Sequence, residues 1–400
     1  MIPLLAGILV FAASIISLRL GLSVAIIEMV LGVVAGNYFG FKAEPWMTYL
    51  AGFGGIVLTF LAGAEVDFRL MRSKLKESLL IGCASFLFPF IGASAYCYYL
   101  LGWTPNASLI AGIALSTTSL AVVYSVLVET GLTHTKLGKI IMASTFVTDM
   151  GTALALSIIF LKASVYTLIF VIVSIIVVWL AAKFSGFVFN DKTYKDKVIE
   201  PEIKYIFLLL LVLIYFAGVG NSHAVLPAFV LGLFMSPYFS ENSETKAVRN
   251  RLRTIAYAII TPFFFIVGGL NVSLPLVVGA FGLFVALFLI KQLTKFLGVY
   301  FLAKKYIPKG EMYTTLLMST GLTFGTISSV FGYQMGYINQ VQFSVLIAVV
   351  VASAIIPTVV AQRWFRPVHM EDVIDESTTN NKKKSEKKVK LCLVRRQTRS

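Results

Sequence analysis

Charged residues are scarce in this chain of 400 residues: they make up 13% of it, whereas apolar residues make up 58%. A soluble domain carries roughly 25% charged residues, so the composition excludes an ordinary soluble protein. Cysteine is also rare, and Cys83, Cys97 and Cys392 show no metal-ligand spacing. We find no Walker motif, no dinucleotide-binding loop and no nucleophile–base pair. We therefore expect a protein that is not an enzyme and that uses no cofactor.

Long apolar segments fill the chain instead. Cutting the sequence at charge clusters, Pro and Gly gives about thirteen segments near the length of a membrane span. Backbone polar groups in lipid need internal partners, so each segment is predicted to be a helix. The fold class is then an all-α integral membrane protein. The segments are residues 2–18, 21–40, 46–63, 77–101, 106–128, 140–161, 164–187, 204–219, 223–240, 254–270, 274–303, 312–334 and 341–362.

Lys and Arg are distributed unevenly between alternate loops. One set of loops holds only Lys42 and Lys162, whereas the other holds clusters within residues 69–76, 192–204 and 246–253. The richer set belongs in the cytoplasm, and an odd number of spans then leaves the N-terminus outside and the C-terminus inside. The net charge of +15 follows mostly from this topology. It does not indicate a nucleic-acid partner; we expect a multi-pass protein of the cell (plasma) membrane, with the bilayer as its partner.

The chain carries no Lys or Arg before its first apolar segment, so we expect a span there and not a cleaved signal peptide. Residues 371–400 begin acidic and end basic. This composition predicts a disordered basic cytoplasmic tail. Its basic end either lies on anionic lipid or only reinforces the topology.

Asp149 is the most informative residue. It is the one charged side chain in the 22 residues between Lys139 and Lys162, and it lies near their middle. An ionised carboxylate at the centre of a bilayer costs roughly 3 kcal/mol or more, so such a residue is a functional candidate. A carboxylate there can hold a proton or a hard monovalent cation. Burial favours the protonated form and a bound cation favours the ionised form, so the two ligands compete.

Two other segments contain runs of glycine and small hydroxyl residues, LSTTSLAVVY and MSTGLTFGTISS, in the fifth and twelfth spans. With the seventh span removed, each run falls in the fifth span of a six-span half. This predicts two inverted six-helix repeats whose broken helices cross at a binding site. Close helix packing is the alternative explanation of such runs. The residues at the crossing are Ser116, Thr117, Thr118, Ser119, Ser319, Thr320, Gly321, Thr323, Gly325 and Thr326.

The broken helices would bring partial charges together in the interior, because each half-helix end carries about half a charge. Lys291 and Lys295 in the eleventh span are candidates for balancing them. They are four residues apart and so share a helix face. Lys295 could instead extend to the cytoplasmic edge of the membrane.

The motifs together resemble a known family. ALSTTSLAVVYSVLVETGL followed by FVTDMGTALAL, and LLMSTGLTFGTISSVFG in the second half, are similar to the cation:proton antiporter-2 family and its NapA-type sodium/proton antiporters. The likeness runs from about residue 5 to 365. It implies an NhaA/NapA-like fold, a homodimer, and a core domain that moves against a dimerisation domain.

The resemblance also divides the chain. It implies a dimerisation domain in residues 1–63 and 204–270, a core ion-transport domain in 77–161 and 274–362, a linker helix in 164–187 and the tail in 371–400. Asp149 matches the family's ion-binding aspartate, while Thr148 stands where relatives have Asp, Asn or Gln. Lys295 is the first choice for the family's charge-balancing lysine, and Lys291 the second. The uncharged Thr148 leaves the proton stoichiometry open and resembles the electroneutral branch.

Three further acids, Glu28, Glu65 and Glu129, are possible accessory groups. Glu28 resembles the acid of the family's early span and has either a structural or a functional role. Glu65 and Glu129 lie at cytoplasmic span ends, where they could be solvated or attract cations.

The predicted function is exchange of a monovalent cation for H⁺ by alternating access. Oxygens from Thr148 and from the Thr118 and Thr323 regions would complete the shell of a transported Na⁺ at Asp149. The same ligands would serve K⁺ or Li⁺, so a K⁺/H⁺ antiporter is an alternative. A sodium-coupled symporter for an organic anion, and a channel or membrane sensor, are the others.

Overall fold

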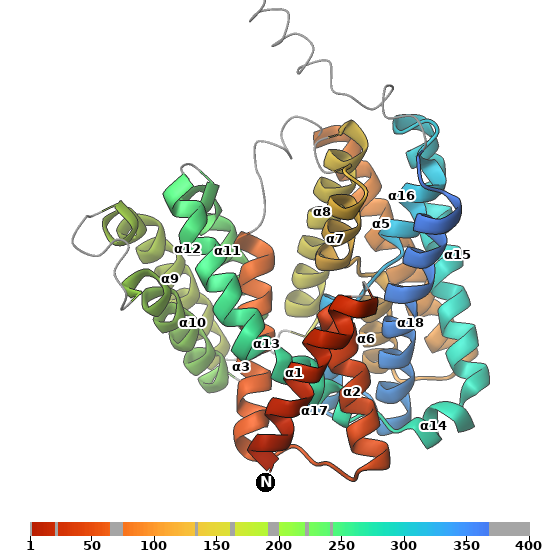
Figure 1. The fold of residues 1–400 in the computed structure, drawn as a ribbon, viewed down its shortest axis with the longest axis horizontal. Coiled ribbons are helices and arrows are strands. Elements are labelled where there is room, and N and C mark those ends of the chain that lie inside the picture. The colour runs from red at the N-terminus through yellow and green to blue at the C-terminus, as the bar shows by residue number, and fades with distance from the viewer. Residues whose placement is uncertain are drawn as a thin grey trace, which may run out of the picture.

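A computed structural model describes residues 2–20, 23–64, 75–132, 135–160, 165–190, 200–220, 224–240 and 243–367. Within these ranges the chain is a bundle of helices (Figure 1). Each of the thirteen predicted spans corresponds to one helix or to consecutive helices, so the all-α prediction is confirmed. Among the residues that the structure describes, nine helices are long and apolar enough to cross a membrane. Large apolar side chains such as Leu18 and Phe301 are exposed on the outside of the bundle, where lipid would cover them.

The first half of the chain supplies seven predicted spans. Its helices are α1 (Ile2–Leu20), α2 (Val24–Tyr38), α3 (Pro45–Ala64), α5 (Leu75–Ala95) with the π-helix η1 (Tyr96–Leu100), α6 (Pro105–Ser116), α7 (Leu120–Glu129), α8 (Lys136–Ile159) and α9 (Val165–Asn190).

The second half supplies the remaining six. Its helices are α10 (Pro201–Val219), α11 (Val225–Ser240), α12 (Ser243–Ile255) with the π-helix η2 (Ala256–Ile260), α13 (Thr261–Leu270), α14 (Leu274–Gly279), α15 (Phe281–Tyr306), α16 (Glu311–Met318), α17 (Thr323–Gln334) and α18 (Gln340–Trp364).

The helices pack in two groups. One group joins α2, α3, α11 and α13, and the other joins α5, α6, α8, α15, α16, α17 and α18. In Figure 1, α9, α10 and α12 lie at one side of the molecule and α15, α16 and α18 at the other. The closest packing in the first group is between α3 and α11: a Cβ at Gly63 would lie 2.1 Å from the carbonyl oxygen of Phe229, and one at Gly232 would lie 2.1 Å from that of Phe60. Only glycine permits this approach of two helix backbones.

Two boundaries differ from the sequence prediction. The predicted span 274–303 is two helices, α14 and α15, because Ala280 between them has a non-helical backbone (φ −107°, ψ 32°). The predicted loop before residue 254 is helical, and α12 begins at Ser243. Val248 and Leu252 of α12 and Ala256, the first residue of η2, explain this extension. They recur every four residues and are buried, so the continuous helix has one apolar face.

Candidate functional site

Both predicted helix breaks are present. Between α6 and α7 the chain leaves the helical conformation at Thr117, which is extended (φ −68°, ψ 157°). Between α16 and α17 the helix is interrupted from Ser319 to Leu322. Carbonyl groups freed at the breaks accept hydrogen bonds inside the protein, and such internal partners are what permits unwound backbone at membrane depth. The Ser116 hydroxyl donates to Ile113 O (2.9 Å), and the Thr320 hydroxyl donates to Leu317 O (2.8 Å).

The two breaks cross each other in direct contact. The backbone N–H of Ser119 donates to the carbonyl of Thr320 (2.9 Å), and the hydroxyl of Thr118 donates to the carbonyl of Met318 (2.9 Å). A Cβ at Gly321 would lie 2.5 Å from the Thr117 hydroxyl oxygen. The prediction of crossed broken helices is therefore confirmed, and glycine at position 321 is required by the closeness of the crossing.

At the crossing, half-helix ends with partial charges of the same sign lie together. The carboxyl ends of α6 and α16, at Ser116 and Met318, carry partial negative charge, and the amino ends of α7 and α17 carry partial positive charge. Lys295 lies at the negative side: its amine donates to the Thr118 hydroxyl (3.1 Å) and to the Ser85 hydroxyl (2.8 Å). The Lys295 amine thus lies beside the carboxyl ends of the half-helices. That it balances their partial charge stays a prediction.

Lys291 lies one helical turn away on the same face of α15. Its amine donates to the Ser353 hydroxyl (2.8 Å), and it would lie 2.6 Å from a Cβ at Gly321. Both lysines are fully buried. The alternative in which Lys295 extends to the membrane edge is therefore wrong for this structure. Lys295 is within electrostatic range of both Lys291 and Asp149.

Asp149 lies on α8 and is 2% exposed. It lines a cavity of about 230 Å³ together with Thr323 and Leu120, the first residues of α17 and α7. The amino ends of these half-helices therefore face the cavity that holds the carboxylate, an arrangement that favours negative charge. No group of three or more His, Cys, Asp or Glu gathers among the described residues. A cation at Asp149 would thus take its other ligands from hydroxyl, carbonyl or water oxygens.

Three polar or charged residues of this cavity were not predicted as site residues. Tyr124 comes from α7, and Arg253 and Tyr257 come from the helix that carries α12 and η2. In the sequence, Arg253 belongs to the basic cluster at 246–253 that predicts the orientation in the membrane. One feature of the sequence indicates that Arg253 and Tyr257 could line the same surface: they are four residues apart and therefore share a helix face.

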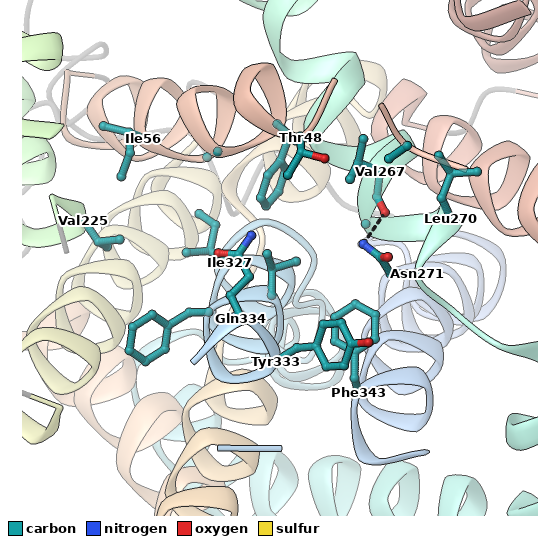
Figure 2. A pocket seen from close by; sticks show the side chains of 18 of the residues that line it. Thr48, Ile56, Val225, Val267, Leu270, Asn271, Ile327, Tyr333, Gln334 and Phe343 are labelled. Carbon is teal, nitrogen blue, oxygen red and sulfur yellow. Dashed lines mark hydrogen bonds between the residues drawn. The ribbon is translucent and has the colours of Figure 1, made fainter. Parts of the chain in front are cut away.

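A second, larger cavity lies toward the other end of the bundle. Its volume is about 780 Å³, and it is lined by the loop after α2 and by parts of α3, α10, α11, α13, α17 and α18. Figure 2 shows Thr48 and Ile56 on one wall and Ile327, Tyr333 and Gln334 facing them. Asp149 is not among the residues that line it. The carboxylate is thus reached by the small cavity and separated from the large one.

The remaining predicted residues form hydrogen bonds within their own helices or are buried outside the small cavity. The Thr148 hydroxyl donates along its own helix to Ser144 O (2.9 Å), and the Ser319 hydroxyl donates to Thr315 O (2.8 Å). Gly325 and Thr326 are buried in the first turn of α17. Glu28 is buried on α2 and lines neither cavity.

Several predictions fall where the structure gives no account. Glu65 and the tail at 371–400 lie outside the described residues, and the side chain of Glu129 at the end of α7 is not described. Their predicted roles stay predictions.

The fold and the buried carboxylate define a multi-pass helical membrane transporter. A family model described as "Sodium/hydrogen exchanger, transmembrane" matches residues 6–366. The chain therefore belongs to the sodium/hydrogen exchanger family, whose members are transporters and not enzymes. The predicted resemblance to sodium/proton antiporters is confirmed.

Individual relatives agree with this assignment. "Probable Na(+)/H(+) antiporter 3" of Methanocaldococcus jannaschii is 27% identical over 353 residues, which cover 84% of this chain and 89% of the relative. A "Na(+)/H(+) antiporter" of Enterococcus hirae is 25% identical over 385 residues, covering 88% and 94%. Among solved structures, a sodium proton antiporter from Methanocaldococcus jannaschii superposes with a TM-score of 0.67 at 16% identity, covering 90% of this chain and 97% of that one.

Proposed function

We propose that this exchanger carries Na⁺ and H⁺ in turn on one carboxylate, that of Asp149. The observation that supports this most is the position of Asp149: it is 2% exposed and lines a cavity together with Leu120 and Thr323, the first residues of α7 and α17. A site that binds either ligand but not both, and that changes its access only when occupied, exchanges one for the other. This is Na⁺/H⁺ exchange without any covalent step.

The cation shell in this proposal is made of oxygen atoms. Asp149 supplies the charge, and Thr323 and the unwound backbone supply neutral oxygens, which suit a hard monovalent cation. Thr148 contributes if its hydroxyl turns from Ser144. Thr118 has a different part, because its hydroxyl already joins Lys295 to the Met318 carbonyl. In this proposal the Thr118 hydroxyl holds the Lys295 amine in place.

Alternating access requires one group of helices to move against the other. We assign the moving core to residues 77–161 and 274–362, the dimerisation domain to 1–63 and 204–270, and the link between them to 164–187. The packing of α5, α6 and α8 with α15 to α18 supports a rigid core. We further propose that the protein is a homodimer in the plasma membrane. Each protomer would consist of two inverted repeats and have its C-terminus in the cytoplasm.

Purified protein in sealed liposomes with a pH-sensitive dye inside tests this function. Addition of Na⁺ should move protons across the membrane without any organic solute. K⁺/H⁺ exchange is the second candidate, because a relative from Bacillus cereus that is 22% identical over 353 residues is named a Na⁺/H⁺-K⁺ antiporter. A panel of Na⁺, Li⁺ and K⁺ distinguishes the two, and no proton movement with any of them would contradict both.

A further inference from the structure

Arg253 is the feature of the Asp149 cavity that the exchange mechanism leaves without a role. Asp149 and Arg253 are the two charged residues in the cavity lining, and the other lining residues are apolar except for Thr323 and the two tyrosines. A cavity that admits a cation thus carries a permanent positive charge in its wall. Guanidinium does not lose its proton in proteins, so this charge is present at every working pH.

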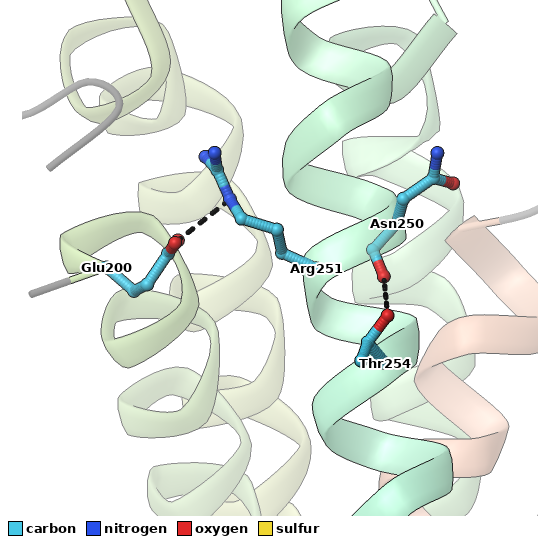
Figure 3. A network of polar contacts seen from close by, with 4 residues as sticks. All are labelled: Glu200, Asn250, Arg251 and Thr254. Atoms are coloured by element: carbon cyan, nitrogen blue, oxygen red, sulfur yellow. Dashed lines mark hydrogen bonds and ion pairs between the residues drawn. The ribbon is translucent and has the colours of Figure 1, made fainter. Parts of the chain in front are cut away.

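The helix that carries Arg253 aims it at the cavity. Arg251, two residues earlier, points elsewhere and forms a salt bridge with Glu200 at 3.0 Å (Figure 3). Residues two apart on a helix do not share a face, whereas residues four apart do. Arg253 accordingly lines the cavity with Tyr257. Tyr257 is in the π-helix η2, and single turns of π-helix occur often at functional sites.

Arg253 and Asp149 belong to different groups of helices. Arg253 precedes η2 and α13, which pack against α2 and α3, whereas Asp149 is on α8, which packs against α5 and α6. A movement of one group against the other changes the separation of the two charges. The small cavity lies toward the end of the bundle where α12 is found, the upper end in Figure 1. The charge of Arg253 therefore acts on the site when the site is open to that end.

We propose that Arg253 is an electrostatic barrier that weakens Na⁺ binding at Asp149 from the face of the membrane that bears α12. A fixed cation in a confined cavity with low-dielectric walls repels an entering cation. It sets the Na⁺ concentration at which exchange begins on that face. Arg253 touches no transported ion in this account; it determines affinity through its charge. The inference rests on the proposed role of Asp149.

A charge series at position 253 tests the proposal. The KM for Na⁺ on the α12 face should fall about fivefold in Arg253→Gln, fall further in Arg253→Glu, and stay within about twofold in Arg253→Lys. The KM on the opposite face and the maximal rate should change little. Membrane vesicles of each orientation give the two KM values, and a cysteine introduced at the exposed Asn250 and labelled with an impermeant reagent identifies the α12 face.

Arg251→Gln is the matched control. It removes the same charge from the same helix, and its salt bridge is partly exposed, with side chains 32% and 25% accessible, so its loss costs little stability. We expect an unchanged KM. An equal shift in Arg251→Gln and Arg253→Gln would overturn the proposal, because the effect would then be one of general surface charge. A KM for Na⁺ that is the same in Arg253→Lys, Arg253→Gln and Arg253→Glu would also overturn the proposal.

A second experiment tests the proposal if one of these variants folds poorly. Arg253→Cys can be purified and then modified with a positively or a negatively charged thiol reagent, with the unsubstituted protein as the control for Cys83, Cys97 and Cys392. The negative adduct should give a lower KM than the positive one, and equal values would contradict the proposal. Exchange with an unchanged KM in every variant would reject only Arg253; exchange that survives Asp149→Asn would reject the proposed function itself.

Discussion

The amine of Lys295 donates a hydrogen bond of 3.1 Å to the hydroxyl of Thr118, and that hydroxyl donates one of 2.9 Å to the carbonyl of Met318. One lysine is thus connected to both broken helices, directly to the first and through one hydroxyl to the second. The carboxyl ends of two half-helices meet here, and we expect a positive charge on Lys295 to make their closeness favourable.

Lys295→Ala should therefore destabilise the protein, by about 2 kcal/mol, because it removes the donor of two buried hydrogen bonds. Thermal unfolding of the purified protein checks this. Loss of a positive charge near Asp149 also favours the protonated carboxyl, so exchange should begin at a higher pH. Lys291→Ala should lower stability but move the pH profile less, because Lys291 bonds to Ser353. If the pH profile shifts only in Lys291→Ala, the assignment of the balancing lysine is one turn wrong.

Gly321→Ala should disrupt the crossing. Its methyl group would lie 2.6 Å from the Lys291 amine and 2.7 Å from the Thr117 carbonyl oxygen, and relief of such contacts in a packed interior costs about 1–3 kcal/mol. We expect a lower unfolding temperature and a lower exchange rate. Gly52→Ala in α3 is the matched control, since a Cβ there meets nothing within 4 Å. Equal stability of the two variants would contradict the close crossing.

Glu28→Gln should leave exchange intact. Glu28 is buried on α2 but lines neither the small cavity nor the large one. The amide keeps the shape of the side chain and removes only its ability to ionise. Na⁺-driven proton flux in liposomes should stay close to the unsubstituted rate, because the side chain reaches neither cavity. Loss of flux with a normal unfolding temperature would show that Glu28 belongs to the transport site.

Exchange should be electroneutral. Thr148 carries no charge beside Asp149, and we expect Lys295 to stay protonated throughout the cycle because it faces half-helix carboxyl ends. One proton then moves for each Na⁺. Exchange in liposomes with an imposed membrane potential measures this. A rate and an end point that both follow the potential would show that a second proton moves.

Much of this architecture could be predicted from the sequence because the membrane leaves few choices. Apolar segments of spanning length must be helices, and all thirteen are found. The breaks at Thr117 and Ser319 could be predicted because runs of hydroxyl residues and glycine recur at matching positions of the two halves, which favours broken helices over close packing. A buried acid such as Asp149 stands out for the same reason: its burial is costly.

The remaining features depend on contacts between distant segments. The sequence around Lys291 and Lys295 does not show that their amines bond to Ser353 and Ser85. From the sequence alone, extension of Lys295 to the membrane edge is therefore an alternative. Arg253 was hidden among basic residues that a topology rule explains equally well. The π-helix η2 after it has no sequence signature that we can identify.

The most direct test of the account is Na⁺-driven proton flux in sealed liposomes that contain Asp149→Asn. The amide can release no proton and offers no charge to a cation, while its neutrality removes the cost of burial. The account predicts that the variant is folded, with an unfolding temperature no lower than that of the unsubstituted protein, and that the flux is abolished. A folded variant that still exchanges Na⁺ for H⁺ would contradict it.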